Sequence, residues 1–141
     1  MFCHHIDEDK QILISNPDAV RVYDIPFEYQ KKDRLVYCTL IEHAVLHLLI
    51  AAETYGKRGS DQSLGVQGYM YYIRPNILSW LVYANEPKAK WSIDCWNAVR
   101  MEPSKAKRLV KEMDKFLLHN YPSITSNDLR AAYEDSVFSR F

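Results

Sequence analysis

The chain has 141 residues, with 18 basic and 18 acidic side chains, 48% hydrophobic residues and four glycines. These values are typical of one soluble globular domain, and they exclude a disordered charged chain, which would lack the apolar residues for a core. The net charge is zero, but residues 1–54 carry five basic and nine acidic side chains, so the positive excess lies in residues 55–141. Any contact with a polyanion must therefore be local.

No segment predicts a membrane span or an exported chain. No uninterrupted apolar stretch reaches bilayer length, and the start, Met-Phe-Cys-His-His, lacks the basic-then-apolar pattern of a signal peptide. We therefore expect a cytoplasmic protein with no membrane partner. Three cysteines, Cys3, Cys38 and Cys95, are too few for a disulfide framework, so we expect reduced thiols or one or two metal ligands.

The first third of the chain predicts short strands separated by a long loop. Residues 2–6 form an extended segment, and residues 11–14 are a second candidate strand. Residues 35–38, Leu-Val-Tyr-Cys, are β-branched and aromatic, which favours a further strand. Residues 6–34 put 29 positions between the first pair of histidines and this strand. Loops of that length usually have a function or a structure of their own.

A helix is predicted from Thr39 to about Thr54. Thr39 and Glu42 have the spacing of a capping box, in which each side chain bonds to the backbone amide of the other residue. The interior of this segment is apolar nearly all round, which predicts a buried helix.

The second half of the chain predicts further helices. An apolar run covers 69–84 with an interruption at Arg74-Pro75, and the other candidates are 91–99, 104–119 and 129–134. We therefore predict an α+β fold. Residues 1–54 would form a strand-and-helix unit, and residues 55–141 a helical region that packs on it within one compact domain.

Four of the five histidines fall in two close groups. His4 and His5 are adjacent on the predicted strand, where neighbouring side chains point to opposite sides. His43 and His47 are four residues apart on the predicted helix, so both lie on one helix face. The order strand, loop, strand and helix is the pattern of a ββα metal site.

Imidazoles in this pattern can bind a metal ion and transfer a proton. Neutral imidazole binds zinc, nickel and similar ions, and three such ligands leave an open coordination position for catalysis. A fourth histidine turned away from the ion can accept a proton from water. A metal ion in such a site polarises a phosphoryl oxygen and stabilises the leaving oxygen.

Two segments resemble the HNH, or His-Me finger, nucleases. They are Cys-His-His-Ile-Asp at 3–7 and Leu-Val-Tyr-Cys-Thr-Leu-Ile-Glu-His-Ala-Val-Leu-His-Leu-Leu-Ile at 35–50. Phage-borne and homing-type members often have His-His-Ile, then Asn-Leu-Val-x-Leu-Thr, then Glu-His-x-x-x-His-x-Leu-Leu. The resemblance covers residues 2–54. It implies a metal-dependent endonuclease that cleaves DNA, in the bacterial host cytoplasm if the chain is phage-encoded.

The resemblance also implies roles for single residues. The second histidine of the first pair is the general base, which is His5 here. The metal ligands would be His4, His43 and His47, holding one divalent ion from the set Zn, Ni, Mn and Mg. Glu42 precedes the ligand pair as in the family, although its capping role with Thr39 suffices to explain it.

The sequence departs from the family pattern ahead of the second strand. The family usually has Asn there to tie the loop together, whereas this chain has Arg34, which cannot accept a hydrogen bond. Arg34 could contact phosphate instead, and with Lys31 and Lys32 it is the best local candidate for DNA backbone contact.

Acidic residues in the long loop are a second departure. Asp7, Glu8 and Asp9 follow the first histidine pair directly. Any of them could supplement or replace a histidine ligand, and a magnesium site would favour such oxygen ligands.

Two other readings of the sequence stay open. The chain could be a non-catalytic phage-type protein on an HNH scaffold that binds and inhibits a host defence protein, since the zero net charge and the aromatic-rich second half suit a protein partner or a homodimer. A closed structural zinc site would be favoured instead if Cys3 or Cys38 completed four ligands.

Overall fold

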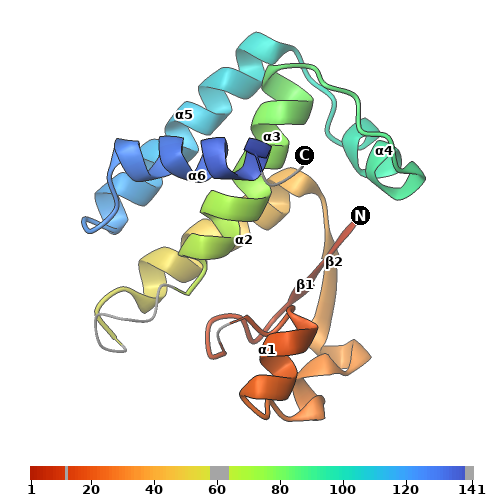
Figure 1. The fold of residues 1–141 in the computed structure, drawn as a ribbon, viewed down its shortest axis with the longest axis vertical. Coiled ribbons are helices and arrows are strands. Elements are labelled where there is room, and N and C mark those ends of the chain that lie inside the picture. The colour runs from red at the N-terminus through yellow and green to blue at the C-terminus, as the bar shows by residue number, and fades with distance from the viewer. Residues whose placement is uncertain (12, 58–63, 139–141) are drawn as a thin grey trace.

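The computed structural model describes residues 1–11, 13–57 and 64–138. Two antiparallel strands, β1 (Phe2–His5) and β2 (Leu35–Cys38), form the sheet, with His4 opposite Val36 and His5 opposite Leu35. Helix α2 (Leu40–Thr54) follows directly. Figure 1 shows the strands and α1 towards one end of the molecule, and α3, α5 and α6 towards the other.

The long loop between the strands has structure of its own. It contains α1 (Pro17–Val22), capped by the Asn16 side chain, and two short 3₁₀ turns, η1 (Phe27–Gln30) and η2 (Lys32–Arg34). The strand expected at 11–14 is wrong, because the described residues of that segment form turns. Leu13 there has a φ of 55°, a left-handed conformation that interrupts an extended strand.

Helix α2 begins at the predicted capping box. The Glu42 amide donates to the Thr39 hydroxyl at 3.2 Å, and the Thr39 amide donates to the Glu42 carboxylate at 2.7 Å. The expectation that the helix is buried all round is wrong on one side, since Val45 is 42% exposed and Leu49 is 48% exposed. The opposite side carries Ala44, Leu48 and Ala51 into the core.

The second half of the described chain is helical. A continuous helical run passes through η3 (Gly68–Ile73), α3 (Arg74–Ile77) and η4 (Leu78–Val82), in which η3 and η4 are wider π-helical turns on either side of the expected interruption at Arg74-Pro75. Helices α4 (Lys90–Asn97), α5 (Pro103–Asn120) and α6 (Ser126–Phe138) follow.

Helices α2, α5 and the η3–η4 run enclose one hydrophobic core, which includes the fully buried Tyr69. The Tyr69 hydroxyl donates to Asp114 at 2.9 Å, and the Arg74 guanidinium donates to both oxygens of the same carboxylate at 2.8 and 2.9 Å. This bidentate ion pair fixes the run against α5. The fold is thus mixed and mostly helical, in agreement with the α+β prediction.

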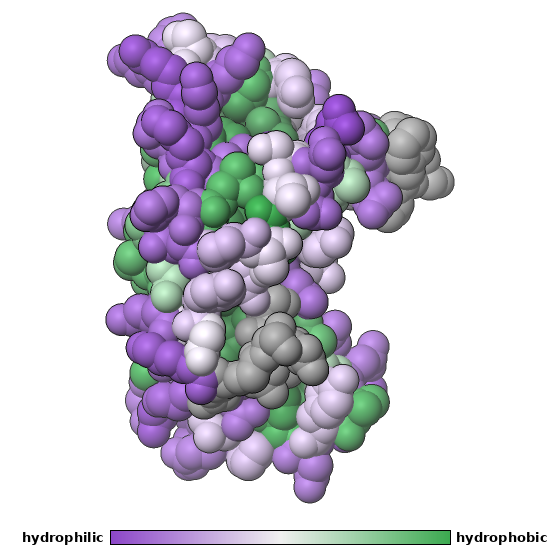
Figure 2. Space-filling view, turned by 90° about the vertical axis from the view of Figure 1, so that its left-hand side faces the viewer, coloured by the Kyte–Doolittle hydropathy of each residue, from purple (hydrophilic) through white to green (hydrophobic). Residues whose placement is uncertain are grey.

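Among the described residues, none of the helices combines the length and apolar character needed to cross a bilayer. Hydrophobic side chains do reach the surface. Figure 2 shows them on one face as separate patches between hydrophilic ones. The most exposed large hydrophobic residues include Val22, Phe27, Tyr37, Tyr72 and Trp91.

Candidate metal centre

Three of the four predicted site histidines converge where the sheet meets α2. His4 comes from β1, and His43 and His47 come from successive turns of α2. One ring nitrogen from each lies within 4.8 Å of the other two. His4 is 3% exposed and His47 is 7% exposed, so the cluster is inside the protein. The predicted ligand set is therefore assembled in space.

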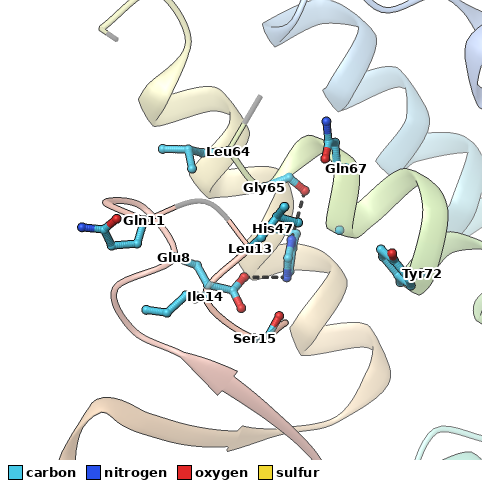
Figure 3. Close-up of a pocket in the computed structure, with 11 residues that line it drawn as sticks. Glu8, Gln11, Leu13, Ile14, Ser15, His47, Leu64, Gly65, Gln67 and Tyr72 are labelled. Carbon is cyan, nitrogen blue, oxygen red and sulfur yellow. Dashed lines mark hydrogen bonds and ion pairs between the residues drawn. The ribbon is translucent and has the colours of Figure 1, made fainter. Parts of the chain in front are cut away.

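A backbone carbonyl sets the orientation of His47. Its Nδ1 lies 3.0 Å from the carbonyl oxygen of Gly65, which can only accept, so Nδ1 carries a proton (Figure 3). In the neutral ring Nε2 is then the lone-pair atom, and it lies 3.2 Å from Nε2 of His43. Metal-binding histidines commonly donate their other ring nitrogen to a carbonyl in this way.

Two glycines make room for His47. Gly65 has a φ of +75°, and a Cβ there would lie 2.3 Å from the His47 carbonyl oxygen. A Cβ on Gly68 would lie 2.2 Å from Cε1 of the His47 ring. Both distances are below any real contact, so the backbone closely approaches His47 both just before η3, at Gly65, and at its first residue, Gly68.

Glu8 also points into the cluster. Its Oε2 lies 3.0 Å from Nε2 of His47 and 3.6 Å from Nδ1 of His4. Burial raises the pKa of Glu8, but the hydrogen bond from His47 and the nearby imidazoles outweigh burial, and the pKa lies below its usual range. The carboxylate is therefore ionised at neutral pH.

The imidazoles are suited to bind a cation. Burial lowers the pKa of His43 to about 4, and burial also lowers the pKa of His4, so both rings are neutral at pH 7. Nδ1 of His4 and Nδ1 of His43 are buried without a hydrogen-bond partner in the described chain. A neutral His47 would face the Glu8 oxygen with a lone pair. The pair is stable only with a positive charge, either a proton on His47 or a metal ion between them.

His5 lies beside the three-histidine cluster, and unlike those histidines it contacts the Gln30 side chain. Its Nε2 is 3.0 Å from Oε1 of Gln30, and the Gln30 amide nitrogen donates to the Ile14 carbonyl at 2.9 Å. That second bond assigns the amide orientation, so Gln30 accepts and His5 Nε2 donates. Nδ1 of His5 is then the basic nitrogen; it is buried, unpartnered in the described chain and 3.9 Å from Oε1 of Glu8.

The basic residues predicted to contact DNA lie at the end of the loop, next to His5. Lys31 pairs with Glu28, and Arg34 lies 3.4 Å from the buried carboxylate of Asp7. Lys32 is exposed in the turn before β2. Arg34 is thus half-buried in a structural ion pair, and Lys32 is more accessible.

The remaining candidate ligands are not in the cluster. Asp7 is bound by Lys10 and Arg34, and Asp9 pairs with none of the cluster histidines among the described residues. Cys3 is exposed, and burial raises the pKa of the Cys38 thiol to about 11, which disfavours the thiolate needed for binding. The cysteine-completed structural zinc site therefore finds no support.

The sequence did not single out Gln30, Gly65 or Gly68. Gly65 and Gly68 carried only a weak signal, since they are two of four glycines and the other two, Gly56 and Gly59, have the same spacing. Gln30 carried none, because its role depends on how the loop folds back to His5.

A pocket of about 80 Å³ opens beside His47. Figure 3 shows it between the loop that carries Glu8 and the start of η3, with Tyr72 at one side. This volume admits several water molecules. Glu8 is the charged residue among the described residues that line it, and no lysine or arginine is among them.

Comparisons with family models, with curated proteins and with solved structures found no match to this chain. Function therefore has to be inferred from the chemistry of these side chains.

Proposed function

We propose that this protein is a metal-dependent endonuclease of the HNH type that hydrolyses DNA phosphodiester bonds. One observation carries the proposal: His4, His43 and His47 converge at the junction of two antiparallel strands and a helix, and Nδ1 of His5 lies beside them with no hydrogen-bond partner among the described residues. A ligand triad with an adjacent base is the combination that metal-assisted hydrolysis needs.

In this proposal the four histidines have two roles. His4, His43 and His47 hold one divalent ion, of zinc, nickel, manganese or magnesium. When bound, the ion supplies charge stabilisation at the phosphoryl group and the leaving oxygen. His5 accepts the proton of the attacking water at Nδ1, while Gln30 holds the opposite nitrogen in its protonated form. The Glu8 carboxylate, 3.9 Å from Nδ1, stabilises the imidazolium that forms.

Charge near His5 supports a polyanionic substrate. The η2 turn, Lys32–Arg34, leads into β2, whose first residue Leu35 is opposite His5. Lys32 is exposed there and can reach a phosphate whose ester bond lies near the base.

The test compares His5→Ala with His119→Ala on supercoiled plasmid and on single-stranded DNA. His119 is the exposed fifth histidine on α5, so it controls for loss of an imidazole. Both variants and the wild type are stripped with EDTA and supplied with Mg, Mn, Ni or Zn. We expect metal-dependent cleavage by the wild type and His119→Ala, and none by His5→Ala, with equal metal binding. Cleavage by His5→Ala at the wild-type rate would remove the base assignment.

A second candidate function is a non-catalytic phage-type protein that binds a host defence protein. Two observations favour it. The described lining of the pocket beside His47 is acidic rather than basic because of Glu8. Apolar side chains are also exposed elsewhere, such as Tyr37 at 70%. This function predicts that folded, metal-loaded wild type cleaves neither substrate with any of the four metals. It also predicts that bound metal raises the melting temperature.

A further inference from the structure

The geometry points to Glu8 as the fourth protein ligand of the metal centre. With His4, His43 and His47 it gives a three-nitrogen, one-oxygen donor set that suits a four-coordinate ion of the zinc class. This inference rests on the metal site of the proposed function, and it does not depend on DNA hydrolysis.

Three of the six donor–donor distances of a four-ligand site can be compared with those of a tetrahedron. Zinc binds nitrogen and oxygen ligands at about 2.0–2.1 Å, so neighbouring ligand atoms of a tetrahedral site lie about 3.3 Å apart. Three edges of the cluster can be compared with this value. Glu8 Oε2 is 3.0 Å from His47 Nε2, His47 Nε2 is 3.2 Å from His43 Nε2, and Glu8 Oε2 is 3.6 Å from His4 Nδ1. Glu8 takes part in two of these three edges.

Glu8 and its neighbour Asp7 have different charge partners in the fold. Asp7 is 1% exposed and is neutralised by Lys10 and Arg34. The ion pairs of Glu8 within the described chain are all with imidazoles. A buried carboxylate without a lysine or arginine partner among the described residues favours a bound cation, and a divalent ion among those four donors would supply its charge.

The donor set also predicts which ion binds. Magnesium and calcium prefer oxygen ligands, whereas three imidazoles and one carboxylate suit zinc and its neighbours. With Glu8 bound through Oε2, its Oε1 still faces Nδ1 of His5. One carboxylate then fills the fourth position and contacts the neighbouring histidine, so a substrate oxygen must displace Glu8 or enter as a fifth ligand.

The experiment measures metal binding by the full chain without any cleavage assay. Zinc affinity is measured by competition with a chromogenic chelator, and cobalt is used as a spectroscopic substitute whose visible absorption is strong in four-coordinate sites and weak in six-coordinate ones. The variants are Glu8→Gln and Glu8→Asp, and the control is Glu28→Gln, an exposed loop carboxylate paired with Lys31. Circular dichroism at the working temperature confirms that each variant is folded.

We expect a four-coordinate cobalt spectrum for wild type and Glu28→Gln. Glu8→Gln should lower zinc affinity at least tenfold and weaken the visible band. Glu8→Asp keeps the charge but shortens the side chain, so it should also lose affinity if direct binding matters. Wild-type zinc affinity and an unchanged spectrum in both Glu8 variants would overturn the inference and leave the three-histidine site intact. A metal bound by Glu8 in a wild type that cleaves no DNA would instead refute the proposed function alone.

Discussion

Gly68→Ala should destabilise the protein, although the same change in an open helix would stabilise it. Gly68 has helical backbone at the start of η3, where alanine is favoured over glycine by about 1 kcal/mol. The added Cβ, however, would lie 2.2 Å from Cε1 and 2.4 Å from Nδ1 of the His47 ring. Relief requires the ring to turn or η3 to move, and overpacking of this kind costs about 1–3 kcal/mol.

The same displacement should weaken the metal site. A turned His47 loses the 3.0 Å bond to the Gly65 carbonyl, and loss of such an orienting contact lowers metal affinity about 10- to 100-fold. Urea unfolding of the metal-free protein and zinc competition measure the two effects separately. Gly56→Ala is the control, since nothing lies within 4 Å of a Cβ added there, although Gly56 differs from the helical Gly68 in having a φ of +74°. It should cost about 1 kcal/mol of backbone strain and leave zinc affinity unchanged.

Wild-type stability and wild-type zinc affinity in Gly68→Ala would refute this prediction. In that case the His47 ring would not be held against η3, and its orientation would have to come from the Gly65 carbonyl alone.

Three further predictions concern the metal-free protein. His43 has a pKa of about 4 in the fold and an ordinary value of 6.5, so between these pH values only the unfolded chain binds its proton. The free energy of unfolding should therefore fall by about 1–3 kcal/mol, after allowance for partial exposure, as the pH drops from about 6.5 to about 4. His43→Gln should reduce this fall in urea titrations. Asp114→Asn leaves the Arg74 charge unbalanced and should cost about 2–4 kcal/mol of unfolding free energy, whereas Glu112→Gln on the exposed side of α5 should cost almost nothing. Thr39→Ala removes the cap of α2 and should lower stability by about 1 kcal/mol in thermal melts, while Thr39→Ser should stay near wild type.

The elements with strong local signals could be predicted from the sequence. The capping box at Thr39, the β-branched strand at 35–38 and the apolar periodicity around 104–119 each depend on residues near in the chain. The convergence of His4 with His43 and His47 was expected from the resemblance to the ββα pattern, and it depends on the pairing of two strands that are distant in the chain.

What could not be predicted depends on contacts between distant segments. Gln30 acts on His5 across 25 residues, and Gly65 and Gly68 contact His47 only because the η3 run packs against α2. The π-helical turns around Pro75 leave no periodic signature in a short apolar run. The exposed side of α2 was missed because an all-apolar pattern does not tell which face another helix covers.

At Arg34 the two ends of the long loop are joined by an ion pair and a backbone hydrogen bond instead of by an asparagine side chain. The HNH pattern that the sequence resembles usually has an asparagine here that ties the loop, and an arginine cannot accept a hydrogen bond. Here the acceptors are supplied instead by the backbone and by Asp7: the Ile6 amide donates to the Arg34 carbonyl at 3.0 Å, and the Arg34 guanidinium lies 3.4 Å from the Asp7 carboxylate. Asp7 begins the loop and Arg34 ends it, so this pair joins the two ends of the insertion.

The closed loop also affects the candidate metal site. Because Asp7 is committed to Arg34 and Lys10, the next carboxylate along the chain, Glu8, is left to face the histidines. The body of the closed loop then returns Gln30 to Nε2 of His5. The long insertion thus supplies one polar contact that a tight turn could not, from Gln30 to the proposed base, whereas Glu8 lies only three residues after His5. Shortening the loop should therefore disturb His5 before it disturbs the pairing of β1 with β2.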